Sequence, residues 1–186
     1  IATLAEPLAV VLRAIRRVRS RLSPKSNIAI VGAGSIGNFC AQVLSLEDHR
    51  VTVFDKKSER LKLLKSNISK TSTQIKDLDQ FNLIIEATGS ADALNLVLQN
   101  SALDSTILLL GFPYADITYN FEDLVGLEKV IVGSVGAESQ DFSQALKLLP
   151  HLDMQPFTQT VLPLKDFEQA WALFRTSQQL KIILQP

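Results

Sequence analysis

Residues 27–55, NIAIVGAGSIGNFCAQVLSLEDHRVTVFD, decide the fold of this chain. The apolar run 27–31 leads into the glycine turn GAGSIG at 32–37, and a helical pattern follows over about residues 35–46. A second apolar run, 50–54, ends in Asp55. Gly-x-Gly-x-x-Gly between a strand and a helix, with an acid about twenty residues further on, is the fingerprint of a dinucleotide-binding unit.

Each residue of the glycine turn has an expected task. Gly32 would permit the tight turn, Gly34 would let a pyrophosphate approach the backbone, and Gly37 would let the helix pack closely on the strand. Ser35 and Ile36 open the helix, where unpaired N–H groups and the helix dipole favour an anion. We therefore expect the cofactor phosphates to bind at this helix N-terminus.

Asp55 is expected to bind the adenosine ribose, and it also indicates which cofactor binds. A carboxylate can accept two ribose hydroxyls but would repel a 2′-phosphate, so NAD is favoured over NADP. Lys56, Lys57 and Arg60 follow the acid and could partly offset that repulsion. Lys56, which adjoins Asp55, is included among the expected cofactor-binding residues.

The composition excludes several classes of protein. The 186 residues carry 19 basic and 19 acidic side chains, so the charge predicts neither a nucleic-acid nor a membrane partner. One cysteine excludes an internal disulfide and fits a reducing, cytoplasmic compartment. No apolar run is long enough to span a membrane, and no signal peptide is visible. Because the chain begins at Ile1 rather than Met, we expect a piece of a longer protein.

The rest of the chain predicts an α/β fold with a doubly wound parallel sheet, the Rossmann architecture, because apolar runs alternate with helical patterns. Residues 66–80 give only a faint signal, which indicates an abbreviated crossover with a third strand near 71–75. Further strands are expected at 83–89, 106–110, 129–132, 157–162 and 181–184, and helices at 56–65, 91–99, 121–127, 142–149 and 166–177.

We divide the chain into a connecting helix (1–26), a dinucleotide-binding domain (27–156) and a C-terminal strand–helix–strand segment (157–186). The first helix has an apolar stripe from Leu4 to Leu22 and arginines on the opposite side. Such a helix could bind a membrane or an acidic partner. We favour a solvent-exposed basic face above a core-facing stripe.

Four apolar runs end in glycine at the edge where their carboxyl ends should meet: Gly32, Gly89, Gly111 and Gly133. In an open parallel sheet, ligands bind beyond that edge, at the point where the strand order reverses. Strands also end in glycine for turn reasons alone. Beside the glycine turn, however, the four positions favour a cofactor stretched along the edge, with its reactive half near Gly89 and Gly111.

Catalytic side chains are scarce, and we assign neither a catalytic nor a metal-binding residue. Cys40 is expected as a small buried residue, and His49 as a surface residue at the opposite edge of the sheet. His151 has no spaced partner, and the sequence lacks His-x-x-x-His, Cys-x-x-Cys and a nucleophile elbow. Glu86, inside a buried run, is expected as a hydrogen-bonded structural carboxylate rather than a general base.

Taken together, several motifs resemble the medium-chain dehydrogenase/reductases of the zinc alcohol and polyol dehydrogenase type. The resemblance spans essentially the whole chain. It rests on AEPLAV at 5–10, VGAGSIG at 31–37, VFD at 53–55 with RL at 60–61, IEATG at 85–89, LGFP at 110–113, IVGS at 131–134 and the tail 160–184.

The resemblance implies an NAD(H)-binding domain without the N-terminal catalytic domain that holds zinc and substrate. The C-terminal helix and short strand would return toward that domain, and the intact enzyme would pass hydride between an alcohol or polyol and nicotinamide. Arg60 would contact the adenosine ribose, while Thr88, Gly89, Gly111 and Phe112 would line the nicotinamide half. Glu6 matches a glutamate near the catalytic zinc, although in this chain we favour an ordinary helix N-terminal acid.

The family often forms dimers through the sixth strand, here about residues 129–134, so an edge-to-edge homodimer is plausible. Two other functions stay open from the sequence. The first is a non-catalytic module that binds or senses NAD(H). The second is an S-adenosylmethionine-dependent methyltransferase, against which the glycines at 111 and 133 and the C-terminal segment argue.

Overall fold

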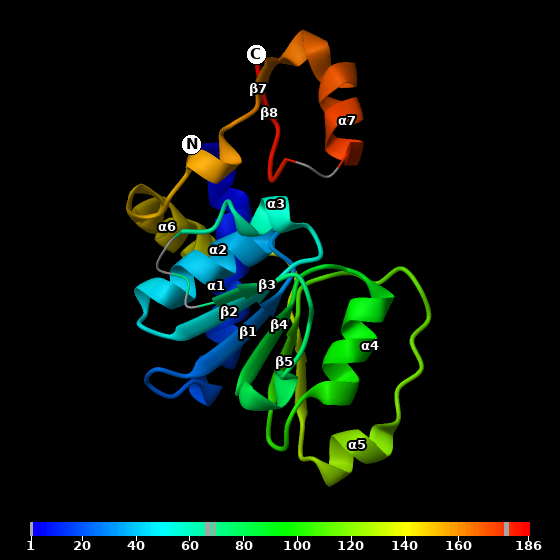
Figure 1. The fold of residues 1–186 in the computed structure, drawn as a ribbon. Coiled ribbons are helices and arrows are strands. Elements are labelled where there is room, and N and C mark those ends of the chain that lie inside the picture. The colour runs from blue at the N-terminus through cyan, green and yellow to red at the C-terminus, as the bar shows by residue number, and fades with distance from the viewer. Residues whose placement is uncertain (1, 66–67, 69, 177–178) are drawn as a thin grey trace.

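A computed structural model of the chain describes residues 2–65, 68, 70–176 and 179–186. Its main feature is a six-stranded parallel sheet in the order β3-β2-β1-β4-β5-β6 (Figure 1). The order reverses between β1 and β4, so the predicted doubly wound Rossmann fold is confirmed. The strands are β1 (Asn27–Val31), β2 (Arg50–Phe54), β3 (Lys70–Ser72), β4 (Leu83–Glu86), β5 (Thr106–Leu109) and β6 (Val130–Gly133).

Helices cover both faces of the sheet (Figure 1). The helices α1 (Ala5–Val18), α2 (Ser35–Leu46) and α6 (Ser139–Leu148) pack on one face, and α4 (Ala91–Asn100) packs on the other. Because successive strand residues point to opposite faces, Ile28 and Ile30 join the first core, whereas Ala29 and Val31 join the second. Burial on both faces explains why β1 reads as a continuous apolar run.

The N-terminal segment consists of η1 (Ala2–Leu4), α1 and η2 (Arg19–Arg21). The apolar stripe of α1 is buried, as expected. The arginines on the opposite side are mostly exposed, as expected. In addition, Arg16 donates hydrogen bonds to both carboxylate oxygens of Asp141, each at 3.1 Å. Arg16 also contacts Glu138 at 3.0 Å, and Arg13 lies 3.6 Å from the same carboxylate. These acids form the capping box of α6, so the arginines join two helices.

The crossover from β2 to β4 is abbreviated, as the sequence predicts, but its helix and strand have other bounds than expected. The helix expected at 56–65 forms only as α3 (Ser58–Leu61), and the third strand occupies 70–72 instead of 71–75. Part of the predicted segment, 66–67 and 69, lies outside the described residues. The chain returns through the single turn η3 (Leu78–Gln80), and Ile75 packs against the core beneath α4 rather than in a strand.

After β5, a loop leads to α5 (Phe121–Gly126), then to β6 and α6. The C-terminal elements are η4 (Leu149–His151), η5 (Gln155–Phe157), β7 (Val161–Pro163), η6 (Leu164–Asp166), α7 (Phe167–Thr176) and β8 (Ile183–Gln185). The strand expected from residue 157 begins only at 161, because Phe157 instead stacks on Phe39 of α2 with ring centroids 4.1 Å apart. The end predicted for the next helix, residue 177, lies outside the described residues.

The strands β7 and β8 pair in parallel, and with α7 they lie beyond the main sheet (Figure 1). One side of α7 exposes three large apolar side chains, Phe167, Trp171 and Phe174, each by more than half of its surface. Among the helices of the described residues, none combines the length and the apolar character that crossing a membrane requires.

Candidate functional site

The glycine turn between β1 and α2 has a conformation that two of its glycines make possible. Gly32 adopts φ +107°, and a Cβ there would lie 2.9 Å from Cγ2 of Thr88 and 3.0 Å from the Ala87 backbone. A Cβ on Gly37 would lie 1.7 Å from the carbonyl oxygen of Gly32. A side chain at either position would therefore require the backbone of the turn to move.

Gly34 differs, because the space above it is open. A Cβ on Gly34 would meet only Nη1 of Arg60, at 4.0 Å. Gly34 is the N-cap of α2, and its carbonyl accepts the first helical hydrogen bond from Asn38 N at 2.8 Å. The amides of Ser35, Ile36 and Gly37 lie in the first turn, where helix geometry supplies no carbonyl partner. This open helix N-terminus suits a phosphate group.

The hydroxyl of Ser35 points away from that role, because it donates a hydrogen bond to the carbonyl of Leu180. This contact joins the start of α2 to the segment before β8. Ser35 can thus offer its backbone amide to an anion while its side chain holds the C-terminal segment. The sequence pattern gave no sign of this contact, since the two residues are 145 positions apart.

Asp55 is nearly buried at the end of β2 and binds two backbone amides. Its Oδ2 accepts from Ala33 N at 2.8 Å, and its Oδ1 accepts from Lys57 N at 2.8 Å. Nη1 of Arg60 lies 3.6 Å from Oδ2. The carboxylate therefore holds the glycine turn against β2. Each oxygen has a further lone pair that can accept a ribose hydroxyl.

A cavity of about 350 Å³ opens beside the glycine turn. Asp55, Lys56, Arg60 and, just after β4, Thr88 contribute polar groups to its lining. Ile75, Ala93 and Leu96 add an apolar wall, which residue patterns did not identify as part of a site. The apolar residues of the helix predicted at 91–99 were the one sequence feature that could have indicated Ala93 and Leu96 as part of this wall. The cavity has the combination of apolar walls and few polar groups typical of a small-molecule site.

Gly89 and Gly111 lie against each other at the ends of β4 and β5. Gly89 has φ +67°, and a Cβ on Gly111 would be 2.2 Å from Gly89 N. Gly111 and Phe112 line a separate hollow of about 310 Å³, together with Arg13, Gly133 and other residues. The residues expected near the nicotinamide thus lie just after the carboxyl ends of β4 and β5, but the structure does not place them all in the cavity that contains Asp55.

Glu86 is fully buried at the end of β4, and its Oε1 binds Thr88. Thr88 N donates to Oε1 at 2.7 Å, and the Thr88 hydroxyl donates to the same oxygen. Ser90 N in turn donates to the Thr88 hydroxyl at 2.9 Å. The predicted hydrogen bonding of this carboxylate is confirmed for Oε1. The network fixes which way the Thr88 side chain points within the cavity.

The other candidate groups do not form a reactive site. Burial raises the pKa of the Cys40 thiol to about 12, so the residue stays a protonated core side chain, as expected. His49 lies before β2, but its ring is only 8% exposed, so the expectation of a surface histidine is wrong. In the described parts of the chain, no group of three or more His, Cys, Asp or Glu side chains has a metal-binding arrangement.

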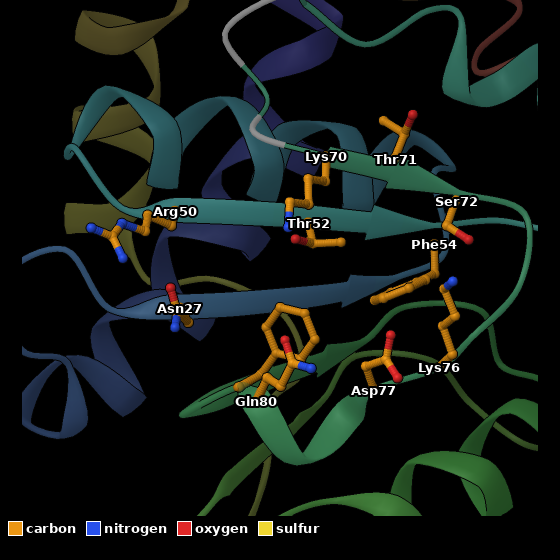
Figure 2. Close-up of a pocket in the computed structure, with 11 residues that line it drawn as sticks. Asn27, Arg50, Thr52, Phe54, Lys70, Thr71, Ser72, Lys76, Asp77 and Gln80 are labelled. Atoms are coloured by element: carbon orange, nitrogen blue, oxygen red, sulfur yellow. The ribbon is translucent and has the colours of Figure 1, made fainter.

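A groove of about 590 Å³ follows the face of β1, β2 and β3 that the short crossover leaves open (Figure 2). Polar residues replace the apolar ones that a covering helix would require, including Arg50, Thr52 and Lys70. Figure 2 shows Arg50 and Lys76 at opposite ends of the groove, so its cations do not converge on one point. The groove is a polar sheet face, distinct from the cavity beside the glycine turn.

Comparisons with known proteins agree on one family. Residues 1–185 match the family model described as glucose dehydrogenase C-terminus. The chain is 28% identical over 173 residues to L-threonine 3-dehydrogenase of Aliivibrio fischeri, covering 85% of this chain and 50% of that protein. It is 33% identical over 166 residues to glucose 1-dehydrogenase 2 of Vulcanisaeta moutnovskia, covering 80% and 47%.

The fold also matches solved structures. Haloferax mediterranei glucose dehydrogenase, solved with NADP, zinc and gluconolactone, superposes with a TM-score of 0.76 at 21% identity, over 90% of this chain and 54% of that one. At this identity the match supports the fold alone. The chain spans about half the length of the curated relatives that it matches.

Proposed function

This chain belongs to the glucose dehydrogenase C-terminus family, and from that premise we propose that it binds NAD(H) for a zinc-type alcohol or polyol dehydrogenase. The observation that carries the proposal is the pairing of an open helix N-terminus at Gly34 with the Asp55 carboxylate beside it. A dinucleotide needs both an anion site for its phosphates and an acceptor for its ribose hydroxyls.

The residues present fit that cofactor. The amides of Ser35, Ile36 and Gly37 would bind the diphosphate, because Gly34 leaves the approach to them open. Asp55 would accept the adenosine ribose hydroxyls, and Arg60 would lie beside them. When bound, nicotinamide accepts or returns a hydride. Thr88, Gly89, Gly111 and Phe112 would border that half, and the two glycines allow the backbones after β4 and β5 to pack against each other there.

We propose NAD rather than NADP. Asp55 is nearly buried and places a negative charge where a 2′-phosphate would have to lie. Lys56 and Arg60 border the same cavity and reduce this repulsion. The nearly buried acceptor still favours free hydroxyls over a phosphate, because a carboxylate cannot donate a hydrogen bond to a phosphate.

The substrate half of the intact enzyme would come from another part of the protein. The described residues offer no zinc-binding cluster, and the chain covers about half of its relatives. We therefore propose that this chain alone binds cofactor without oxidising alcohols, and that the division at 26/27 and 156/157 separates a cofactor domain from flanking segments. A cytoplasmic location is part of this proposal and agrees with one buried, unpaired cysteine.

A homodimer through β6 is the corresponding proposal for assembly. β6 ends the sheet order, so one edge of its backbone faces away from β5. Ile131 on this strand is 37% exposed, and Val135 just after it is 64% exposed. Pairing two such edges across a two-fold axis would satisfy the open backbone groups and cover these side chains.

Calorimetric titration of the purified chain with NAD⁺, NADP⁺ and S-adenosylmethionine tests the proposed function. We expect saturable binding of NAD⁺, weaker binding of NADP⁺ and none of the third ligand. Binding of S-adenosylmethionine alone would instead favour the methyltransferase alternative. If the chain binds NAD⁺ but the full open reading frame encodes no zinc-type Cys and His ligands, the sensing module would be favoured.

A further inference from the structure

The carboxylate of Glu86 has one oxygen that the fold engages and one that it leaves without a partner. Oε1 accepts hydrogen bonds from the amide and the hydroxyl of Thr88. Oε2 is buried and has no hydrogen-bond partner among the residues that the structure describes. A buried, half-satisfied carboxylate is costly, so its retention at this point of the sheet calls for a reason.

The position of Oε2 indicates that reason. A Cβ on Gly111 would lie 2.5 Å from Oε2 and 2.2 Å from Gly89 N. The oxygen therefore lies against the backbone of Gly111 and close to Gly89, just after the ends of β4 and β5. These are the backbones that the proposed function places beside the nicotinamide ring. The carboxylate thus lies next to the backbone of both residues that would border the ring.

We infer that Glu86 makes the site prefer the oxidised cofactor, because its buried carboxylate lies next to the backbones that would border the nicotinamide ring. This inference rests on the proposed function. The nicotinamide ring carries a positive charge in NAD⁺ and none in NADH, whereas the rest of the two molecules is the same. A negative charge at this depth therefore stabilises the first form selectively, and the low local dielectric strengthens the attraction.

Glu86 acts here as a positioning and electrostatic residue, since it lies against the glycine backbones that would border the cofactor. The expected size is about a tenfold preference for NAD⁺ over NADH, or about 1.4 kcal/mol. For a two-electron couple, a tenfold ratio lowers the reduction potential of the bound cofactor by about 30 mV. The affinity for a ligand without the ring should not depend on the charge of Glu86.

The test compares wild type with Glu86→Gln and Glu86→Asp by measuring Kd for NAD⁺, NADH and ADP-ribose. Glu86→Gln removes the charge but keeps an acceptor for Thr88, and Glu86→Asp keeps the charge. Glu122→Gln, the same change at an exposed position of α5, is the control. We expect Glu86→Gln to lose about tenfold in NAD⁺ affinity relative to NADH, with ADP-ribose unchanged. Glu86→Asp should retain most of the preference.

An unchanged NAD⁺ to NADH ratio in a Glu86→Gln protein that still binds ADP-ribose would overturn the inference and leave the proposed function intact. A wild-type chain that binds neither ADP-ribose nor NAD⁺ would overturn the proposed function itself. If Glu86→Gln does not fold, the wild-type ratio decides, because equal or tighter binding of NADH contradicts a preference for the oxidised form.

Discussion

Gly34→Val separates the binding task of the glycine turn from its folding task. The backbone at Gly34 has φ −70° and ψ −171°, an extended conformation that valine adopts without strain. The new Cβ would meet only Nη1 of Arg60, at 4.0 Å, which the flexible arginine can accommodate. The fold should therefore survive, with a stability loss of about 1 kcal/mol or less for a poorer N-cap residue.

The cofactor should not survive this substitution. A diphosphate must bring its oxygens to about 2.9 Å from the helix amides, and valine adds methyl groups roughly 1.5 Å beyond its Cβ in that space. We expect at least about a hundredfold weaker NAD⁺ binding, equivalent to about 2.8 kcal/mol. Calorimetric titration measures this loss, and the melting temperature and circular dichroism check the fold.

Gly126→Val is the matched control, because a Cβ at Gly126 has no heavy atom within 4 Å in the described structure. It should bind NAD⁺ like the wild type. Gly37→Val is the opposite case and should not fold properly, since its Cβ would overlap the carbonyl oxygen of Gly32. A folded Gly34→Val protein with wild-type affinity for NAD⁺ would refute the reasoning.

Three further predictions concern the acid, the helix pair and the sheet edge. Asp55→Asn should lower NAD⁺ affinity about tenfold and narrow the difference from NADP⁺, as titration of both ligands will measure; an unchanged ratio would argue against the ribose role. Burial works to raise the pKa of Asp141, but hydrogen bonds from Arg16 and from the Glu138 amide outweigh it and lower that pKa. A carboxylate with a lowered pKa stabilises the fold above its unfolded pKa of about 3.9, and this stability is lost as the pH falls through the folded pKa. Asp141→Ala should therefore cost about 1 kcal/mol at pH 7. Below about pH 4, the stability of the variant, measured with denaturant, should depend less on pH than that of the wild type. Ile131→Lys should reduce dimer formation in sedimentation experiments without changing the melting temperature of the monomer, and an unaltered dimer would place the interface elsewhere.

The fold could be predicted from the sequence because its decisive signals are local. The turn at 32–37 needs glycine at fixed spacing, and buried parallel strands read as unbroken apolar runs. The sequence signal for the shortened crossover was faint for a related reason. Residues 73–82 make a single 3₁₀ turn and no covering helix, so the adjoining strands carry Thr52 and Lys70 where apolar residues would otherwise signal a strand.

The details of the site could be predicted only in part, because several depend on contacts between distant residues. Nothing near Asp55 in the sequence indicates that its carboxylate also holds the Ala33 amide. The pattern of the first helix likewise does not indicate the contact of Arg16 with Asp141, which lies 125 positions away. The oxygen of Glu86 that has no hydrogen-bond partner within the described parts of the chain likewise depends on the pairing of β4 and β5, which brings Gly111 next to it.

Amide NMR of the isotopically labelled chain during titration with ADP-ribose tests the central claim most directly. Binding of a diphosphate to the start of α2 predicts that the largest shift changes fall on the amides of Ser35, Ile36 and Gly37, with Ala33 and Lys57 responding through Asp55. Saturable changes confined to the polar groove around Arg50 and Lys70, or no changes at all, would contradict it.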